Sequence, residues 1–162
     1  RDTGITTGCD VANFCPKNAV TREQMASFVA RFWRYTYNDC PTGPMPFGDL
    51  TSTSFAFRDV ICIFGLGITT GTSATTYSPD DAVSREQMAA FVARLWRALG
   101  GTCPNGDHPF LDVATSFALD DINCIYLLGV TTGTSATTYS PTDPVTREQM
   151  AAFLSRLDLL LI

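Results

Sequence analysis

The chain has 162 residues, of which 45% are hydrophobic and 17% are charged, so it has enough apolar residues for a core and is not a disordered chain. Sixteen acidic residues against eleven basic ones leave a net charge of −5, which argues against a nucleic-acid partner because phosphate binding needs a basic face. No apolar stretch approaches the roughly 20 residues that span a bilayer, so no membrane insertion is expected.

Two short motifs occur three times along the chain. Gly-Ile/Val-Thr-Thr-Gly begins at Gly4, Gly67 and Gly129, and Thr/Ser-Arg-Glu-Gln-Met begins at Thr21, Ser84 and Thr146. Both motifs return at offsets of 63 and then 62 residues, so the repeating unit is about 62 residues long. A unit of this size is typical of a small module that buries its apolar face by packing against neighbouring copies.

The first repeat contains only the second half of the unit. Phe47-Gly-Asp49 corresponds to Phe110-Leu-Asp112, and each leads into an apolar run that ends at the glycine motif, but the first repeat has no such half. The sequence opens on Arg1 with neither Met nor a signal-peptide pattern, which predicts a processed product or a segment of a longer protein. We therefore predict one compact domain built from a partial repeat and two complete ones, over residues 1–46, 47–109 and 110–162.

Three long helices are predicted to begin at Thr21, Ser84 and Thr146. Each of these residues has a Gln three positions later, which is the pattern of a capping box, and a preceding Val that can pack against the Met of the first helical turn. Apolar residues then recur at helical spacing in all three segments. The three amphipathic helices are therefore expected to share one core, with their aromatic residues packed inside it.

The first position of each long helix is an arginine: Arg22, Arg85 and Arg147. Backbone N–H groups at a helix start have no partner within the helix, so an anionic group there would meet a guanidinium and the positive helix end together. A structural alternative stays open. Each Arg can instead pair with a nearby Asp, such as Asp49 or Asp112, and hold neighbouring repeats together.

Two short helices are predicted over about residues 55–66 and 117–128, capped by Ser54 and Ser116. A glycine follows each of them, at a position where the left-handed conformation that ends a helix needs a residue without a Cβ. The polar segment 72–79, nearly copied at 134–141, is an expected surface loop. The fold class is therefore predicted as mainly α with little sheet.

The six cysteines favour disulfides over a metal site. They form no Cys-x-x-Cys pair and His108 is the single histidine, so we expect neither a structural zinc nor a cofactor. The repeat register aligns Cys40 with Cys103, and Cys62 with Cys124, which predicts the equivalent bonds Cys40–Cys62 and Cys103–Cys124.

A third disulfide can close a loop in the first repeat. Cys9 and Cys15 lie where the second repeat has Thr72 and Ser78, and the third has Thr134 and Ser140. Disulfides persist in an oxidising compartment, so the chain is expected to be secreted or on the cell surface. The alternative is a cytosolic protein with six unpaired thiols.

The order of motifs in the repeat resembles that of the S-layer homology domain: Phe-x-Asp, a short helix, Gly-Ile-x-x-Gly, Tyr-x-Pro and then Thr-Arg-Glu-Gln. The resemblance covers the chain from Gly4 to Leu157. It implies a pseudo-threefold helical bundle that anchors proteins non-covalently to a secondary cell-wall polysaccharide, often a pyruvylated glycan, on the bacterial cell surface.

The resemblance also implies site residues in grooves between repeats. The family's arginine, whose guanidinium meets the acidic ligand, corresponds to Arg22, Arg85 and Arg147, and its glycines, where the backbone approaches the sugar, correspond to Gly8, Gly71 and Gly133. The family's usual Trp at the start of the short helix is Phe55 and Phe117 here, and the cysteines are additional.

No catalytic arrangement is apparent, so no enzyme activity is expected. His108 lies alone in a loop, and the carboxylate pairs at 80–81 and 120–121 are explained by helix starts. The leading interpretation is a cell-wall anchoring module that holds an attached upstream domain. The alternative is a structural subunit of an extracellular assembly or filament, in which a neighbouring subunit or another segment completes the first repeat and the apolar tail, Leu159 to Ile162, docks onto other chains.

Overall fold

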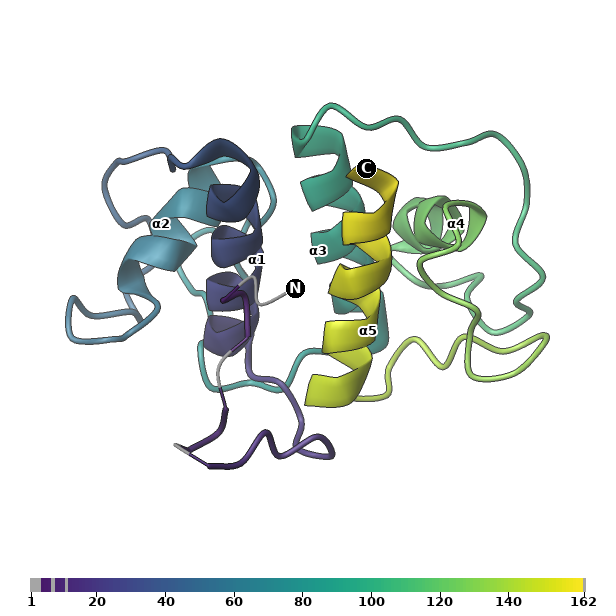
Figure 1. The fold of residues 1–162 in the computed structure, drawn as a ribbon, viewed down its shortest axis with the longest axis horizontal. Coiled ribbons are helices and arrows are strands. Elements are labelled where there is room, and N and C mark those ends of the chain that lie inside the picture. The colour runs from purple at the N-terminus through teal and green to yellow at the C-terminus, as the bar shows by residue number, and fades with distance from the viewer. Residues whose placement is uncertain (1–3, 7, 11, 162) are drawn as a thin grey trace.

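The computed structural model describes residues 4–6, 8–10 and 12–161; Arg1, and Ile162 of the apolar tail, lie outside the described residues. The elements are three long helices, α1 (Arg22–Tyr37), α3 (Arg85–Ala98) and α5 (Arg147–Asp158), two short helices, α2 (Phe57–Gly65) and α4 (Leu119–Leu127), and a final 3-10 turn, η1 (Leu159–Leu161) (Figure 1). Within the described ranges β-pairing is limited to three isolated bridges, which confirms the predicted mainly-α class. None of the described helices is long and apolar enough to cross a membrane.

All three predicted capping boxes are formed. The Thr21 hydroxyl accepts a hydrogen bond from the backbone N–H of Gln24 (3.3 Å), whose side-chain oxygen accepts one from the N–H of Thr21 (3.2 Å). Ser84 and Thr146 make the same reciprocal pair with Gln87 and Gln149. Two donors at each helix start are thereby satisfied by residues three positions apart, which is why the sequence alone located these helices.

The three long helices begin around a ring of backbone hydrogen bonds. The N–H of Val20 donates to the carbonyl of Val145, that of Val83 to Val20, and that of Val145 to Val83, each at 2.9 Å. All three valine side chains are fully buried. This cyclic pattern relates the three long helices by an approximate threefold axis.

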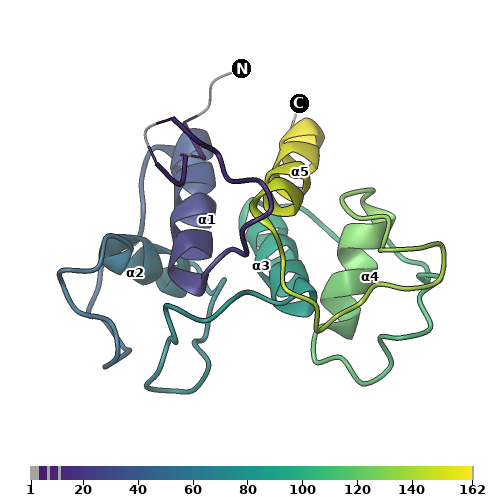
Figure 2. The same ribbon diagram turned by 90° about the horizontal axis from the view of Figure 1, so that it is seen from below.

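The short helices lie on the outside of this ring, with α2 beside α1 and α4 beside α3 (Figures 1 and 2). Each pair is joined by a disulfide, Cys40–Cys62 in the first case and Cys103–Cys124 in the second, as the register predicts. The half-cystines on the helices, Cys62 and Cys124, are buried, so the bonds are part of the core.

The short helices begin later than the sequence suggested, and the prediction that Ser54 and Ser116 cap them is wrong. Helix α2 begins at Phe57 with Ala56 at the N-cap and no side-chain cap. The Ser54 hydroxyl instead accepts from the N–H of Ala56 (3.2 Å) and donates to Glu23 of α1 (3.1 Å). This turn before the helix leaves Phe55 62% exposed, and the equivalent turn leaves Phe117 65% exposed.

One face of α5 is less covered than the matching faces of α1 and α3. Ser27 and Arg34 of α1 bind Asp59 of α2, so the face of α1 that carries positions 27, 30 and 34 is turned to the short helix, and Ala30 on it is fully buried. On α5 the corresponding Ser155 is exposed, and no described helix lies beside it as α2 lies beside α1.

Candidate functional site

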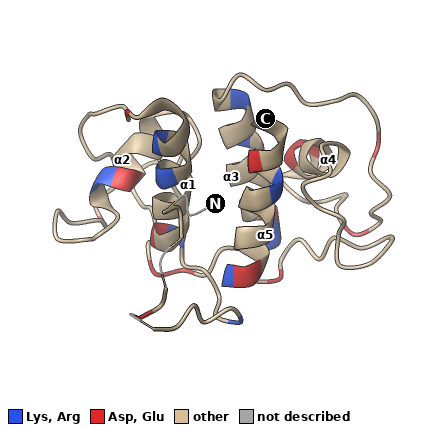
Figure 3. Ribbon diagram, viewed as in Figure 1, with Lys and Arg blue, Asp and Glu red and all other residues tan. Residues whose placement is uncertain are grey.

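Basic residues are concentrated on the helices. Every arginine among the described residues lies on α1, α2, α3 or α5, with the acidic residues interspersed among them and in the loops (Figure 3). Three of these arginines, at the first position of each long helix, are almost completely buried where neighbouring repeats meet. The motif arginines therefore lie at equivalent places between repeats.

Arg22 shows the contacts that the three arginines share. Its Nε donates to the carbonyl of Tyr77 in the next repeat (2.7 Å), and its guanidinium carbon lies 4.8 Å from the centre of the Tyr77 ring and 5.7 Å from that of Phe91. Burial lowers the pKa of Arg22, and the fields of Tyr77 and two aspartates oppose this. In the equivalent bonds, Nε of Arg85 donates to the carbonyl of Tyr139 (2.6 Å) and Nε of Arg147 to that of Phe14 (2.8 Å).

The helix starts are also occupied by the neighbouring repeat. The N–H groups of Arg22 and Glu23 donate to the carbonyls of Asp81 (2.9 Å) and Pro79 (3.0 Å), and α3 and α5 are capped in the same way. The expectation that these N–H groups would be available to an anion is therefore wrong, because the loop before the next long helix satisfies them. An anion between the repeats would have to be held by side chains.

The repeated Phe-x-Asp motif holds that loop in place and forms no ion pair with the motif arginine among the described residues. The carboxylate of Asp49 accepts from the N–H groups of Tyr77 (2.8 Å) and Ser78 (2.7 Å), and the Phe47 ring packs on the Tyr77 ring. Although partial desolvation acts in the opposite direction, these N–H donors lower the pKa of Asp49. Among the ion pairs of the described residues there is none between Asp49 and Arg22, so the arginine holds repeats together through a carbonyl and aromatic rings instead.

Arg22 and Arg147 each line a groove between repeats. The first, which we call the Phe117 groove, is a cavity of about 390 Å³ lined mainly by Arg22, Gly71, Gln87, Arg94 and Phe117. It lies between the loop after α2 and the outer face of α3. Guanidinium and amide donors thus share one cavity with an exposed aromatic ring.

The second cavity repeats the same arrangement one unit earlier. The Phe55 groove, of about 290 Å³, is lined by Arg147, Gly8, Gln24, Arg31 and Phe55, together with Cys9, Ser27 and Phe28. These are the residues that the repeat register makes equivalent to the lining of the Phe117 groove. Arg85 and Gly133 take the corresponding positions next to α5, where Nη1 of Arg156 donates to the carbonyl of Val130 (3.0 Å).

The motif glycines are required by the loop itself. Gly71 has a φ of +79°, and a Cβ there would collide with the Phe47 ring and lie 2.5 Å from the Thr76 carbonyl oxygen and 2.7 Å from that of Ser73. Gly133 is confined in the same way by the equivalent residues of the next repeat. Gly71 and Gly8 also line the grooves, so the loop constraint and a contact with ligand are compatible.

The loop that follows each glycine is closed at equivalent positions by different chemistry. Cys9 and Cys15 form the third disulfide, whereas the Thr72 and Ser78 hydroxyls are hydrogen-bonded at 2.7 Å, as are those of the third repeat. His108 lies apart from both grooves, stacks on Phe110 and accepts from its N–H (3.1 Å). Within the described residues no three potential ligands are grouped around a metal site.

One set of groove residues was missed at the level of sequence. Arg31 and Arg94 line the two grooves nine positions after the motif arginines Arg22 and Arg85, and Arg156 stands at the same spacing after Arg147. This triple recurrence was a usable signal, since none of the three is needed for capping or for the apolar face.

Two comparisons with known proteins bear on this arrangement. The model of the S-layer homology domain matches residues 46–89 and 109–151. An endoglucanase from Bacillus sp. (strain KSM-635) is 37% identical over 119 residues, which is 74% of this chain and 12% of that protein. The chain thus spans only a small part of the length of this curated relative.

Proposed function

The chain belongs to the S-layer homology family of cell-wall anchoring modules, as its motifs predict, and we propose that it binds a secondary cell-wall polysaccharide through the grooves between its repeats. The observation that carries the proposal is the recurrence, in both grooves, of a motif arginine, a capping-box glutamine and an exposed phenylalanine. Members of the family are associated with the bacterial cell surface or cell wall.

The side chains of each groove suit an acidic sugar. The bond from Nε of Arg22 to Tyr77 fixes the plane of the guanidinium, which has further N–H donors for a carboxylate. Gln87 lines the same cavity, and Phe117 offers a ring face against which the C–H face of a sugar can pack. A pyruvylated glycan, whose carboxylate stands on the sugar ring, fits this combination.

We propose further that the chain is the non-catalytic part of a larger secreted protein and holds an attached upstream domain on the wall. The endoglucanase relative is far longer than its matched segment, which supports an anchoring role for this segment within a larger chain. Three disulfides support an oxidising location outside the cell.

Replacing the three motif arginines, Arg22, Arg85 and Arg147, with Gln is expected to lower retention on purified cell-wall polysaccharide at least about tenfold, because each charge-assisted hydrogen bond contributes roughly 1.5–3 kcal/mol. Gln keeps an amide donor for the carbonyl of the next repeat. Co-sedimentation with the polysaccharide measures the loss, and thermal denaturation checks that the variant is folded.

Lys17→Gln serves as the matched control, since Lys17 is a largely exposed cation that lines neither groove. It should be retained like the natural protein. A folded triple variant that is retained as well as this control would refute the role of the arginines.

A second candidate function is a structural subunit of an extracellular assembly. The uncovered face of α5 supports it, because Ser155 is exposed and Leu159, one turn later, is 66% exposed. We propose for this case that a short helix of a neighbouring chain covers the face as α2 covers α1.

Sedimentation velocity over a range of concentrations tests the subunit proposal. A reversible association that Leu159→Arg abolishes, and that Leu111→Arg leaves unchanged, is the expected result. Leu111 is a suitable control because it is 81% exposed and precedes α4. A monomer at all concentrations contradicts the proposal.

A further inference from the structure

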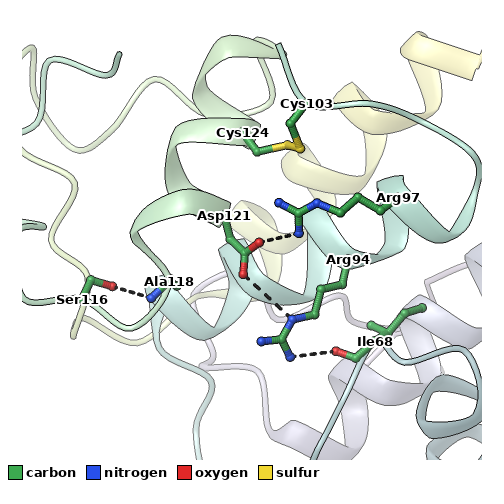
Figure 4. A network of polar contacts seen from close by, with 8 residues as sticks. All are labelled: Ile68, Arg94, Arg97, Cys103, Ser116, Ala118, Asp121 and Cys124. Carbon is green, nitrogen blue, oxygen red and sulfur yellow. Dashed lines mark hydrogen bonds and ion pairs between the residues drawn. A yellow bond between two sulfur atoms is a disulfide. The ribbon is translucent and has the colours of Figure 1, made fainter. Parts of the chain in front are cut away.

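The two grooves differ in how the second arginine is held. In the Phe117 groove, Nη1 of Arg94 donates to the carbonyl of Ile68 (3.3 Å) and its Nε lies 3.9 Å from a carboxylate oxygen of Asp121 (Figure 4). The other oxygen of Asp121 binds Arg97 at 2.6 Å. The charge of Arg94 is therefore partly neutralised from the α4 side.

In the Phe55 groove the equivalent carboxylate is occupied by other donors. Asp59 accepts from the hydroxyl of Ser27 (2.6 Å) and from Nη1 of Arg34 (2.7 Å). Arg31, the counterpart of Arg94, forms no hydrogen bond or ion pair with any residue that the structure describes. One position contributes to this difference, because the Ser27 hydroxyl binds Asp59 and the equivalent residue of the Phe117 groove is Ala90.

The two grooves also differ in the sign of the charge at one equivalent position on their rims. The exposed Arg58 lies beside Phe55 in an adjoining hollow that also contains the ion pair of Arg34 with Asp59, so Arg58 is the cation there without a carboxylate partner among the ion pairs of the described residues. Its counterpart next to Phe117 is the exposed Asp120. The Phe55 ring therefore has basic groups on both sides, whereas the Phe117 ring has an acidic one on the outer side.

The remaining acidic groups do not cancel this difference. Glu23 accepts a hydrogen bond from Ser54, and Glu86 accepts one in the same way from Ser116, so this carboxylate has the same partner beside each groove and is not among the residues that line either one. Asp10 lies next to Cys9, and its oxygens accept from Ala12 (2.8 Å) and Asn13 (2.9 Å) of its own loop.

From these contacts we propose that the two grooves are unequal and that the Phe55 groove is selective for a glycan with acidic groups on two successive sugars. One carboxylate binds between Arg31 and Arg147, the sugar ring packs on Phe55, and the second carboxylate binds Arg58. The Phe117 groove holds one acidic sugar more weakly. This inference rests on the proposed wall-polysaccharide function, and Arg31 and Arg58 are its specificity-determining residues.

The test measures each groove separately in the whole 162-residue chain. The backbone amide signals of Gly8 and Gly71 in ¹⁵N-labelled protein report on the Phe55 and Phe117 grooves during titration with a pyruvylated wall oligosaccharide. The Gly8 signal should be half-saturated at a ligand concentration about tenfold lower than the Gly71 signal, since about 1.4 kcal/mol separates the two affinities. The same oligosaccharide after mild acid removal of pyruvate should lose this difference.

Variants that exchange the distinguishing residues make the test reciprocal. Ser27→Ala with Arg58→Asp gives the Phe55 groove the residues that the Phe117 groove has at these two positions. The Gly8 signal should then be half-saturated at the same ligand concentration as the Gly71 signal. Ala90→Ser with Asp120→Arg should shift the Gly71 curve about tenfold toward tighter binding, on the same conversion of free energy, and leave the Gly8 curve in place. Each substitution is already tolerated at the equivalent position, and thermal denaturation confirms folding.

The outcomes separate the two proposals. Equal curves in the natural protein, or variants that leave the curves unmoved, overturn the inequality of the grooves while binding itself stands. If neither signal responds to the oligosaccharide, and the chain is not retained on intact wall polysaccharide, both proposals are overturned.

Discussion

Gly71→Ala is expected to lower the free energy of unfolding by about 4 kcal/mol, since a Cβ in left-handed backbone costs roughly 1–2 kcal/mol and an overpacked contact typically 1–3 kcal/mol more. The added methyl would meet the Phe47 ring and two carbonyl oxygens of the same loop. For a chain of this length the midpoint of thermal unfolding should fall by about 8–16 °C. Calorimetry measures the shift.

Gly67→Ala is the matched control for this prediction. Gly67 also has a positive φ, of +70°, but nothing lies within 4 Å of the place that its Cβ would take. This substitution should therefore cost only the backbone term, roughly 1–2 kcal/mol. If the two variants lose the same stability, the close packing of the loop around Gly71 is not what requires glycine there.

Replacing Cys40 and Cys62 together with Ala is expected to cost about 3 kcal/mol, by the entropy that a closed loop of this length removes from the unfolded chain. The bond joins the segment after α1 to the core of α2 across 22 residues. Urea denaturation of the natural and variant proteins measures the difference. Reduction of all three disulfides in the natural protein should lower the free energy of unfolding by more than this, because the other two bonds are lost as well.

Cys9→Thr with Cys15→Ser provides the contrasting case. The two cysteines are only 6 residues apart in the sequence, so the stabilisation from chain entropy is smaller, at about 2 kcal/mol. The new side chains can also form the hydroxyl hydrogen bond that Thr72 and Ser78 form at the same positions. A larger loss here than for Cys40–Cys62 would show that the short loop, rather than the α1–α2 junction, depends more on covalent closure.

The features that the sequence determined are those made by residues close together in the chain or repeated in register. The capping boxes involve side chains three positions apart, and periodic apolar residues placed the three long helices. The disulfide pairs followed from register, because equivalent positions in a repeated fold have equivalent neighbours. The family and the mainly-α class required nothing more than this local and periodic information.

The misplaced starts of the short helices show where local information failed. Ser54 has the residue type of an N-cap, but its hydroxyl accepts from the N–H of Ala56 in the turn before the helix and donates a hydrogen bond to Glu23, 31 positions earlier. A contact of this kind depends on how α1 and the turn before α2 pack together. The residue type at Ser54 could not reveal it, since the carboxylate that fixes the hydroxyl lies on another helix.

The tertiary structure alone decided the chemistry of the grooves. The sequence identified Arg22, Arg85 and Arg147, but not that their Nε atoms and the helix starts are bound by a loop more than 50 residues away. It showed that Ser27 and Ala90 are equivalent. It did not show that the Ser27 hydroxyl donates a hydrogen bond to Asp59, which does not pair with Arg31. The physical reason lies in the partners of each carboxylate. A carboxylate that binds other donors does not neutralise the arginine in the groove, and which donors reach it depends on how helices from different repeats pack together.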